Sequence, residues 1–312
     1  MKRIFALLFA IVMFLGCAPA LADTPKPIET IPYDEIPETR EGMYHYLLLC
    51  TDQWNSKPTN LGNTDGIMLL TLDTKANRIM LTSLIRDALV VRPDGVIGRV
   101  TYIAHNYSPE DLCKVLSEHM GIRIEKYVLF SFQQIANIVD YMGGVEIEVD
   151  AADARYLREY PLDAHQTEPK MNRAGTYLFT GRAAVIYMRI RKSGGGGDFT
   201  RTQRARTVLS TLADKCRTMT YEQARDLVDI IASNATMTNM TLEDMVAAME
   251  QAYGLRSCVI EELRIPQDDA VSPIKYAGMS VQELDWAMCR EDIADYMECS
   301  WLIISDDNEF DD

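Results

Sequence analysis

The segment 189–206 reads RIRKSGGGGDFTRTQRAR and places five arginines, one lysine, one aspartate and four consecutive glycines within eighteen residues. A guanidinium group is a planar fork of donors that matches phosphate oxygens, so the segment indicates a polyanion site, with phosphate or pyrophosphate as the simplest ligand. Arg189 and Arg191 alternate with apolar residues as in a strand, and we expect both to face one side. Arg201 and Arg204 lie near the start of a predicted helix, whose dipole adds positive potential.

The glycine run and Asp198 belong to the same prediction. Consecutive glycines allow the backbone to turn sharply and to approach an anion closely. The plainer alternative is a flexible linker beside an ordinary basic helix, but that interpretation leaves Asp198 without a role. We therefore count Asp198 with the arginines as a candidate site residue.

Two further acids lie where predicted strands meet loops. Asp52 ends the apolar run of residues 44–51, and Asp65 opens the next strand thirteen residues later. Carboxylates at neighbouring strand ends can approach closely, and such a pair beside phosphates is a common way to hold Mg²⁺. The alternative is that both aspartates only stabilise turns, which is a frequent role of this residue.

Arg86 follows the predicted strand 79–85. At that position its side chain would point into the crevice beyond the strand ends, where open α/β sheets bind ligands. Its alternative role is a salt bridge to a loop carboxylate, which would stabilise the protein little at a surface.

The elements that must position these residues alternate along the chain. Apolar runs bounded by turn residues predict strands at 44–51, 66–73, 79–84, 126–130, 145–149 and 257–265. Helical periodicity and capping residues predict helices at 109–120, 132–142, 180–187, 201–217, 221–232, 242–253 and 281–297. Residues 150–172 are polar and irregular, which is typical of a surface excursion. The alternation predicts an α/β layered fold.

The net charge of the chain bears on its ligands, and its first residues bear on its cellular location. The chain has 31 Lys+Arg against 46 Asp+Glu and a formal net charge of -15, which argues against general binding to nucleic acid. Lys2 and Arg3, the apolar run 4–15 and the small residues 20–22 predict an export signal peptide over residues 1–22. Cys17 leaves open a lipoprotein signal, and an uncleaved anchor is a third interpretation.

The rest of the chain divides by composition. Residues 23–42 are rich in proline and charge, which predicts a linker, so the folded part should begin near residue 43. Residues 43–217 contain the candidate site, residues 218–305 have a mainly helical pattern, and residues 306–312 form an acidic tail.

Cysteine and histidine add little to the candidate site. Six cysteines follow the signal, and the sequence does not fix their pairing, although a bridge among Cys258, Cys289 and Cys299 is open in an oxidising compartment. The four histidines lie outside the clusters described above, so we expect surface positions or satisfied hydrogen bonds for them.

Short motifs follow one another in a characteristic order. They are Thr51-Asp52, Thr64-Asp65, Arg86-Asp87, Gly143-Gly144-Val145-Glu146, and the RxR and GDFxRxQR patterns of segment 189–206. This order is similar to that of the LytR-CpsA-Psr family of Gram-positive cell-wall enzymes. The resemblance covers about residues 44–212, and its last two motifs are specific in combination.

The resemblance implies a fold and an activity. The fold is a three-layer α/β/α domain with a central mixed β-sheet and a hydrophobic lipid pocket; the helical C-terminal extension is not explained by it. The activity is transfer of a glycopolymer, such as a teichoic acid or capsule, from a polyprenyl-pyrophosphate carrier to peptidoglycan at the membrane surface. An acceptor hydroxyl would attack the sugar-linked phosphorus, and the lipid phosphate would leave.

The resemblance also implies roles for individual residues. Asp52 and Asp65 correspond to magnesium-associated acids. The pyrophosphate would be bound by Arg86, Arg189, Arg191, Arg201 and Arg204. The catalytic residues would be Arg86, Asp198 and Arg201, with Asp198 orienting arginines or assisting the acceptor. Phosphoryl transfer needs charge neutralisation and in-line placement, and arginine forks with one Mg²⁺ supply both without a protein nucleophile.

The lipid would need an apolar lining. The candidates are Leu112, Leu116, Val128, Phe130, Phe132, Ile135, Ile138, Val139 and Met142. Their spacing equally describes an ordinary core, because any amphipathic helix shows it.

Several positions depart from the family pattern. Cys50 replaces a glycine, Gly66 replaces a threonine, and Ile85 replaces a proline. These departures leave other functions open. One is a non-catalytic carrier that binds polyprenyl phosphate, and another is a polyprenyl pyrophosphate hydrolase in which water replaces the acceptor. A third is a structural envelope module stapled by disulfides.

Overall fold

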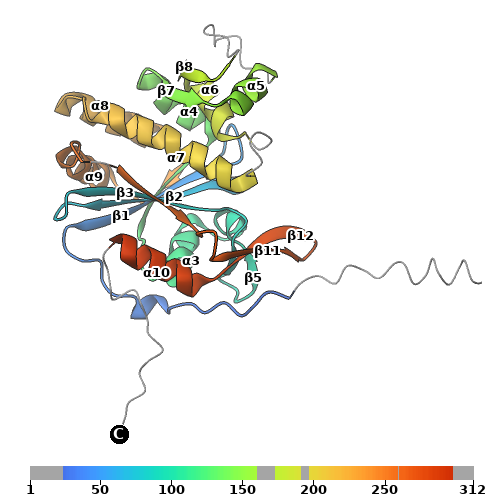
Figure 1. Ribbon diagram of the computed structural model, residues 1–312. Coiled ribbons are helices and arrows are strands. Elements are labelled where there is room, and N and C mark those ends of the chain that lie inside the picture. Colours follow the sequence, from blue (N-terminus) through green and yellow to red (C-terminus); the bar gives the residue numbers. More distant parts are fainter. Residues whose placement is uncertain (1–23, 160–172, 191–196, 259, 298–312) are drawn as a thin grey trace, which may run out of the picture.

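A central sheet separates two layers of helices in the computed structural model, which describes residues 24–159, 173–190, 197–258 and 260–297 (Figure 1). The expectations for the export signal, for Arg191 and for the acidic tail lie outside these residues. The three-layer α/β/α arrangement agrees with the predicted fold class.

The central sheet is mixed and has the strand order β10-β3-β2-β1-β6-β9. Its strands are β1 (Met43–Thr51), β2 (Thr64–Asp73), β3 (Arg78–Leu84), β6 (Lys126–Phe130), β9 (Met237–Thr238) and β10 (Ile260–Ile265). β1 is antiparallel to β2 and parallel to β6, while β3 is antiparallel to β2 and parallel to β10. Three hairpins lie outside it: β4 (Leu89–Val91) with β5 (Ile97–Arg99), β7 (Val145–Val149) with β8 (Gly175–Phe179), and β11 (Val271–Tyr276) with β12 (Met279–Leu284).

One face of the sheet is closely packed. Leu47 and Leu49 of β1 belong to a buried cluster with side chains of α3 (Pro109–Met120) and α10 (Trp286–Met297). The short helix α2 (Ile103–Asn106) contributes to the same cluster. Because successive residues of a strand point to opposite faces, Leu48 and Cys50 lie on the other side.

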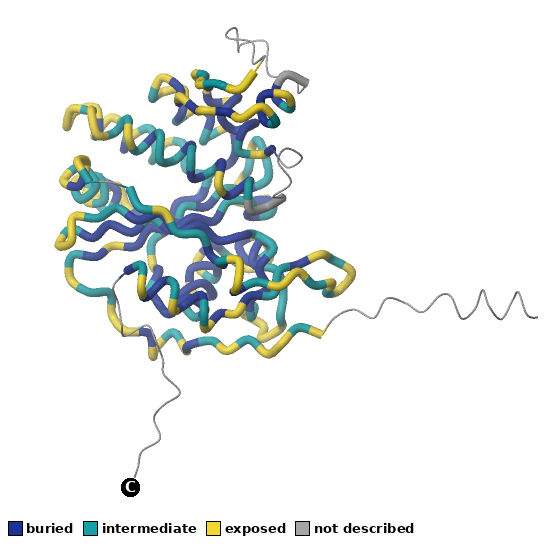
Figure 2. The backbone as a smooth tube through the Cα atoms, in the orientation of Figure 1, coloured by how far each residue is buried: buried dark blue, intermediate teal, exposed yellow. Residues whose placement is uncertain are grey.

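The other face is covered by the remaining helices. They are α4 (Phe132–Tyr141), α5 (Ala151–Glu159), α6 (Gly181–Met188), α7 (Gly197–Cys216), α8 (Tyr221–Asn234) and α9 (Leu242–Gly254). Tyr46 of β1 and Leu72 of β2 pack against α8 and α9, whereas the sheet beneath α4 and α7 borders a cavity. Figure 2 shows the sheet as a buried layer between more exposed helices.

The region after residue 217 completes the sheet in addition to supplying helices. β9 and β10 form its two edges, and β10 pairs with β3, which lies about 180 residues earlier. The helix expected at residues 281–297 begins only at Trp286, because residues 279–284 form β12 of a hairpin. Ala277 and Gly278 both have positive φ at the tight turn of that hairpin.

The expected linker is part of the folded structure. Ile31 and Ile36 are buried, and the Ile31 amide donates a hydrogen bond of 2.9 Å to the Glu118 carbonyl. Arg123 donates to the Ile36 carbonyl at 3.0 Å. Apolar residues spaced along this segment dock it on the α3 layer despite its prolines and charges. The prediction that folding begins near residue 43 is therefore wrong.

Two smaller expectations also need correction. The surface excursion at 150–172 begins with α5, whose first turn is capped by Asp150: its side chain accepts a 2.7 Å hydrogen bond from the Asp153 amide. The described cysteines are free thiols, and Cys258 and Cys289 pack in separate clusters, so no bridge joins these two. Cys299 lies outside the described residues. No helix in the described part of the chain is long and apolar enough to cross a bilayer.

Candidate functional site

Three strand ends bring the predicted acids and Arg86 to one edge of the sheet. Thr51 at the end of β1 pairs with Thr64 at the start of β2, and Ile67 of β2 pairs with Leu84 at the end of β3. This register places Asp52 and Arg86 just beyond the ends of β1 and β3, and Asp65 in the first residues of β2, as the sequence predicts.

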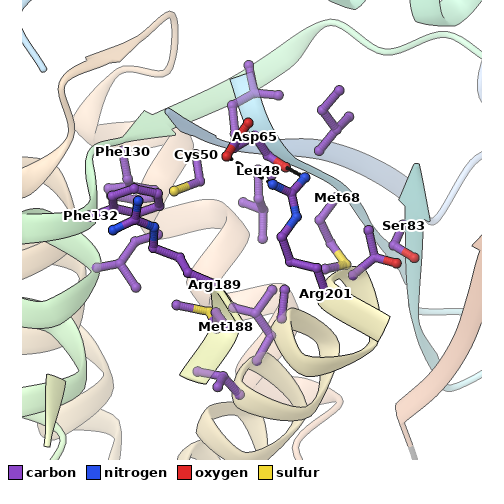
Figure 3. A pocket seen from close by; sticks show the side chains of 18 of the residues that line it. Leu48, Cys50, Asp65, Met68, Ser83, Phe130, Phe132, Met188, Arg189 and Arg201 are labelled. Atoms are coloured by element: carbon purple, nitrogen blue, oxygen red, sulfur yellow. Dashed lines mark hydrogen bonds and ion pairs between the residues drawn. The ribbon is translucent and has the colours of Figure 1, made fainter. Parts of the chain in front are cut away.

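Asp65 is the centre of the charged cluster. Its Oδ1 accepts a hydrogen bond of 2.5 Å from Arg86 Nη1, and its Oδ2 accepts one of 3.0 Å from Arg201 Nη1. Arg201 also donates to the Asp65 carbonyl at 3.1 Å. One carboxylate therefore holds two guanidinium groups that come from different elements, and Figure 3 shows Arg201 reaching it from α7. Arg86 also pairs with Asp87 at 3.6 Å, and Arg99 pairs with the same aspartate at 2.7 Å, so three guanidinium groups share two carboxylates.

Asp52 has different partners. Its two carboxylate oxygens accept hydrogen bonds of 3.0 Å from the backbone and side-chain nitrogens of Asn63. Gly62 makes this close turn possible, because its φ is +73° and a Cβ there would lie 2.5 Å from Asp52 Oδ1. The loop between β1 and β2 thus fixes Asp52 beside the β2 end that carries Asp65.

An apolar cavity of about 160 Å³ lies directly behind Asp65 and Arg201. The sheet contributes Leu48, Cys50, Gly66, Met68 and Ser83, and α7 contributes Thr202, Ala205, Val208, Leu209 and Leu212. On α7 these residues follow the spacing of one helical face, and Arg201 stands at the end of that face where the cavity meets the charged cluster.

The predicted lipid lining is divided by the structure. Phe130, Phe132, Ile135 and Ile138 line the cavity. Leu112, Leu116, Val128 and Val139 are buried in the cores, and Met142 packs against the core beside β7 and β8. Periodicity could not separate these groups. The contribution of α7, which forms a whole wall of the cavity, was missed, although its apolar stripe was visible in the sequence.

Two arginines of segment 189–206 occupy positions that differ from those expected. Arg189 is not on a strand; it is the C-terminal cap of α6, and its guanidinium lies over the Phe132 ring at 4.5 Å from the centroid, where it lines the cavity (Figure 3). Arg204 is buried and forms a bidentate pair with Asp153, at 3.0 and 2.7 Å, and a 3.0 Å hydrogen bond to the Ile190 carbonyl. Arg204 is absent from the cavity lining and joins α7 to α5.

Asp198 lies in the first turn of α7 by its backbone, and its side chain lies outside the described residues. The role expected for this side chain stays a prediction. Arg191 lies outside the described residues entirely.

Arg206 also belongs to segment 189–206, but it was not among the site residues predicted from the sequence. It is buried, pairs with Glu262 of β10 at 3.1 Å, and donates to the Ser83 hydroxyl on β3. Ser210 donates to the same Glu262 at 2.6 Å. Burial lowers the pKa of the Arg206 guanidinium, and Glu262 opposes that shift. This network ties the α7 wall of the cavity to the edge of the sheet.

Cys50 and Gly66 lie opposite each other in the cavity wall. They are register partners on β1 and β2, and a Cβ on Gly66 would lie 3.0 Å from Cys50 Cβ. The two departures from the family pattern are therefore a matched exchange of volume between facing positions. Burial raises the pKa of the Cys50 thiol, so this cysteine is a neutral wall residue.

The acids offer a limited metal site. The described residues contain no cluster of three or more metal-ligating side chains. Mg²⁺ nevertheless commonly takes one or two protein carboxylates, completing its shell with water and substrate phosphates. A carboxylate has about four lone-pair positions, so Asp52 keeps acceptor capacity beyond its two hydrogen bonds to Asn63. The donor set fits such a shared site.

An α/β/α domain with an apolar cavity and an arginine-lined mouth defines the class of protein. A model of the LytR_cpsA_psr family matches residues 24–291, and the chain belongs to this family. The matched region starts earlier and ends later than the residues whose motifs carry the resemblance. It includes the docked N-terminal segment and both edge strands of the sheet.

Two relatives of known name are about a quarter identical to the chain over the aligned residues. It is 28% identical over 247 residues to the polyisoprenyl-teichoic acid–peptidoglycan teichoic acid transferase TagT of Bacillus subtilis, covering 77% of this chain and 73% of TagT. It is 23% identical to TagV of the same organism, covering 76% of this chain and 60% of TagV. The chain thus spans less than two thirds of TagV.

A solved structure confirms the fold. The structure of the family protein YwtF (TagT) with bound octaprenyl pyrophosphate lipid superimposes with a TM-score of 0.64 and 19% identity. The superposition covers 87% of this chain and 96% of that chain.

Proposed function

We propose that the protein transfers a glycopolymer, of the teichoic acid or capsule class, from a polyprenyl-pyrophosphate carrier to peptidoglycan. The observation that carries the proposal is the junction between an apolar cavity and a carboxylate that holds two arginines. A lipid pyrophosphate has the same two parts in the same order. Relatives named as teichoic acid transferases, and a family structure that holds a polyprenyl pyrophosphate, support this assignment.

The proposed mechanism places the lipid in the cavity and the pyrophosphate at its mouth. Arg86, Arg189 and Arg201 would bind the non-bridging oxygens, with Asp65 fixing two of these guanidinium groups before the substrate arrives. An acceptor hydroxyl attacks the sugar-linked phosphorus, the bond from this phosphorus to the bridging oxygen breaks, and polyprenyl phosphate leaves. Fixed guanidinium groups stabilise the charge that develops on these oxygens.

Magnesium belongs to the same proposal. Asp52 and Asp65 would hold the ion, and when bound it would neutralise charge on the phosphate oxygens. Asp198 is proposed to orient the arginines or to assist the acceptor, and Arg191 to bind pyrophosphate with the others. The tight pairing of Arg204 with Asp153 favours an indirect role for Arg204, in which it positions α7.

The cavity must widen to take a long lipid. Its volume of about 160 Å³ is close to that of a cavity that binds one benzene molecule, about 150 Å³. A polyprenyl chain is many times larger, so we propose that α7 moves away from the sheet as the lipid enters. The apolar contacts between these walls can separate in favour of lipid contacts, whereas the Arg206–Glu262 pair limits the movement.

The proposed place of the reaction follows from its substrates. The export signal expected at residues 1–22 would carry the protein to the outer face of the cytoplasmic membrane or the cell wall of a Gram-positive-type bacterium. Both the lipid carrier and the peptidoglycan acceptor are found there.

The test is a transfer assay with purified protein, Mg²⁺, peptidoglycan and a radiolabelled disaccharide linked to polyprenyl pyrophosphate. We expect labelled peptidoglycan and released polyprenyl phosphate. Arg86→Ala and Arg201→Ala should each reduce the transfer rate by about 100- to 1000-fold, the usual effect of removing a charge-stabilising donor. Arg155→Ala, which removes an exposed arginine of α5, is the matched control and should have no effect.

Other outcomes separate the alternatives. Phosphate release that is independent of peptidoglycan would identify a hydrolase. Lipid binding that survives chelation of the metal, with no phosphate released, would identify a carrier. Either result would overturn the proposed transfer.

A further inference from the structure

Two arginine–aromatic pairs run outward from the mouth of the cavity along α6. The Arg189 guanidinium lies 4.5 Å from the centre of the Phe132 ring, and the Arg182 guanidinium lies 4.5 Å from the centre of the Trp54 ring. The two rings meet edge to face with centroids 6.0 Å apart. The four side chains therefore form one continuous row, which we call the arginine–aromatic row.

Close packing of two helices brings the row together. Gly181, at the start of α6, lies so near α4 that a Cβ would stand 1.9 Å from the Ala136 carbonyl oxygen. No residue with a side chain fits at this position without separating the helices. The absence of a side chain at Gly181 thus allows the arginines of α6 to reach aromatic rings that lie beside α4.

The Trp54 loop is fixed to the same helix. The Phe132 amide donates a hydrogen bond of 3.0 Å to the Gln53 carbonyl, and the Gln133 amide donates one of 3.0 Å to the Trp54 carbonyl. The loop that follows Asp52 therefore cannot move independently of the start of α4. Backbone hydrogen bonds thus hold Trp54 beside the start of α4.

The spacing of the row suits a ligand with two separated phosphates. Arg182 and Arg189 are seven residues apart, which is about two helical turns, so their Cα atoms lie on the same side of α6 and about 10 Å apart along its axis. Arg189 lines the cavity, where the pyrophosphate is proposed to bind. Arg182 and Trp54 lie at the other end of the row and outside the cavity lining.

The stacked arrangement prepares each guanidinium for an anion. Both arginines are exposed in a strongly acidic chain. A guanidinium over an aromatic ring is attracted to the face of the ring, and its planar fork matches phosphate oxygens. Because the ring already restricts the side chain, little additional entropy is lost when an anion binds.

We propose that Trp54 and Arg182 form an outer subsite that binds a phosphodiester of the glycopolymer, beyond the sugars that carry the pyrophosphate. This inference rests on the proposed function and names part of its donor substrate: a glycopolymer with phosphate in its repeat. Arg182 contacts the phosphate, and Trp54 is a positioning residue that holds Arg182 at the correct distance from Arg189.

The experiment compares two donors. One is a prenyl pyrophosphate that carries a neutral disaccharide, and the other is the same molecule extended by one glycerol phosphate. Equilibrium binding to the wild-type protein should favour the extended donor by about tenfold, the contribution expected of charge-assisted hydrogen bonds. The preference should shrink as salt concentration rises, because the subsite is exposed.

Variants locate the preference in the subsite. Arg182→Ala should remove it and leave the affinity for the neutral donor unchanged. Arg182→Lys should retain part of it, because the charge remains while the fork is lost. Trp54→Ala should weaken it because the arginine is no longer held. Arg155→Ala, the exposed α5 control, should preserve it.

The possible failures are distinguishable. Equal binding of both donors to the wild-type protein, or an equal loss of both with Arg182→Ala, would overturn the subsite while leaving the proposed function intact. If neither donor binds the wild-type protein, the proposed function fails, and the subsite fails with it.

Discussion

The two faces of the central sheet differ in how completely they are filled. On the face covered by α3 and α10, Leu47 of β1 is 1% exposed and belongs to a closely packed core. On the face beneath α4 and α7, the adjacent Leu48 borders a cavity. One strand supplies both faces, so the difference arises from the covering helices. The packed face provides stability, and the hollow face leaves room for a ligand.

The packed and the hollow face of the sheet also differ in their polar residues. The packed side contains His45 and His119, which are buried and held in the neutral form. His119 Nδ1 donates to the Val115 carbonyl at 2.6 Å, and its Nε2 accepts from the Val91 amide at 3.0 Å. The hollow side instead keeps charged groups, Asp65 with its two arginines, at the rim of the cavity. The charged group at the rim thus lies where a charged ligand is proposed.

The largest expected effect comes from placing the same bulky side chain on each face. Ala294 is buried in α10 on the packed face, and Ala205 lines the cavity on α7. Ala294→Phe should lower the free energy of unfolding by about 3 kcal/mol or prevent folding, because the core has no room. Ala205→Phe should fold with nearly unchanged stability and should abolish binding of polyprenyl pyrophosphate.

Thermal unfolding and lipid binding measured on both variants check this prediction. Unchanged lipid affinity for Ala205→Phe would show that the lipid binds elsewhere. Equal destabilisation by the two substitutions would show that the hollow face is packed as tightly as the other.

Truncating two neighbouring leucines of β1 compares the packing of the two faces within one strand. Leu47→Ala should cost about 2–5 kcal/mol of unfolding free energy, as for other buried leucines. Leu48→Ala should cost only about 1 kcal/mol, because its side chain is not fully enclosed. Urea unfolding of the two variants measures the difference, and equal costs would contradict the account.

Low pH should destabilise the folded protein through the two buried histidines of the packed face. Burial lowers the pKa of His45 and of His119 from 6.5 to about 4. Between these values the unfolded chain binds protons that the folded protein does not, so stability is complete above pH 6.5 and is lost as pH falls toward 4. Each histidine should contribute roughly 3 kcal/mol to this loss.

Unfolding free energies measured between pH 7 and pH 4.5 check the direction. His45→Asn removes one titrating group and should flatten the pH dependence, whatever its effect on stability at pH 7. A profile as steep as that of the wild type would exclude His45 as a source.

The last prediction concerns Cys50 and Gly66, which face each other in the cavity wall. Gly66→Ala should cost about 1–3 kcal/mol, because its Cβ would meet Cys50 Cβ at 3.0 Å. Adding Cys50→Gly should recover most of that loss, since it removes the opposing side chain. A double-mutant cycle by urea unfolding measures the coupling. Strictly additive effects would contradict the proposed exchange of volume.

The elements and charged residues that depend on local patterns were predictable from the sequence. An apolar run predicts β6, and a Ser-Pro pair predicts the start of α3. Ser108 indeed caps α3 by accepting a hydrogen bond from the Asp111 amide. The placement of Asp52, Asp65 and Arg86 at one edge follows from strand ends, which local sequence also indicates.

Features that depend on distant partners were not predictable. Arg201 and Arg204 look equivalent at the start of one helix, yet Arg201 reaches Asp65 and Arg204 reaches Asp153, which lies in a stretch expected to be irregular. The row of Trp54 and Arg182 joins residues 128 positions apart in the chain. β10 reads as an isolated strand until its pairing with β3 is known.

The most direct test of the central claim is a crystal structure of the protein with a polyprenyl pyrophosphate and Mg²⁺. We expect an extended apolar tail between the sheet and α7, with phosphates in contact with Arg86 and Arg201 and the metal at Asp52 and Asp65. Lipid density on any other surface, with the cavity unchanged and the two arginines still paired with Asp65, would contradict the proposed binding mode.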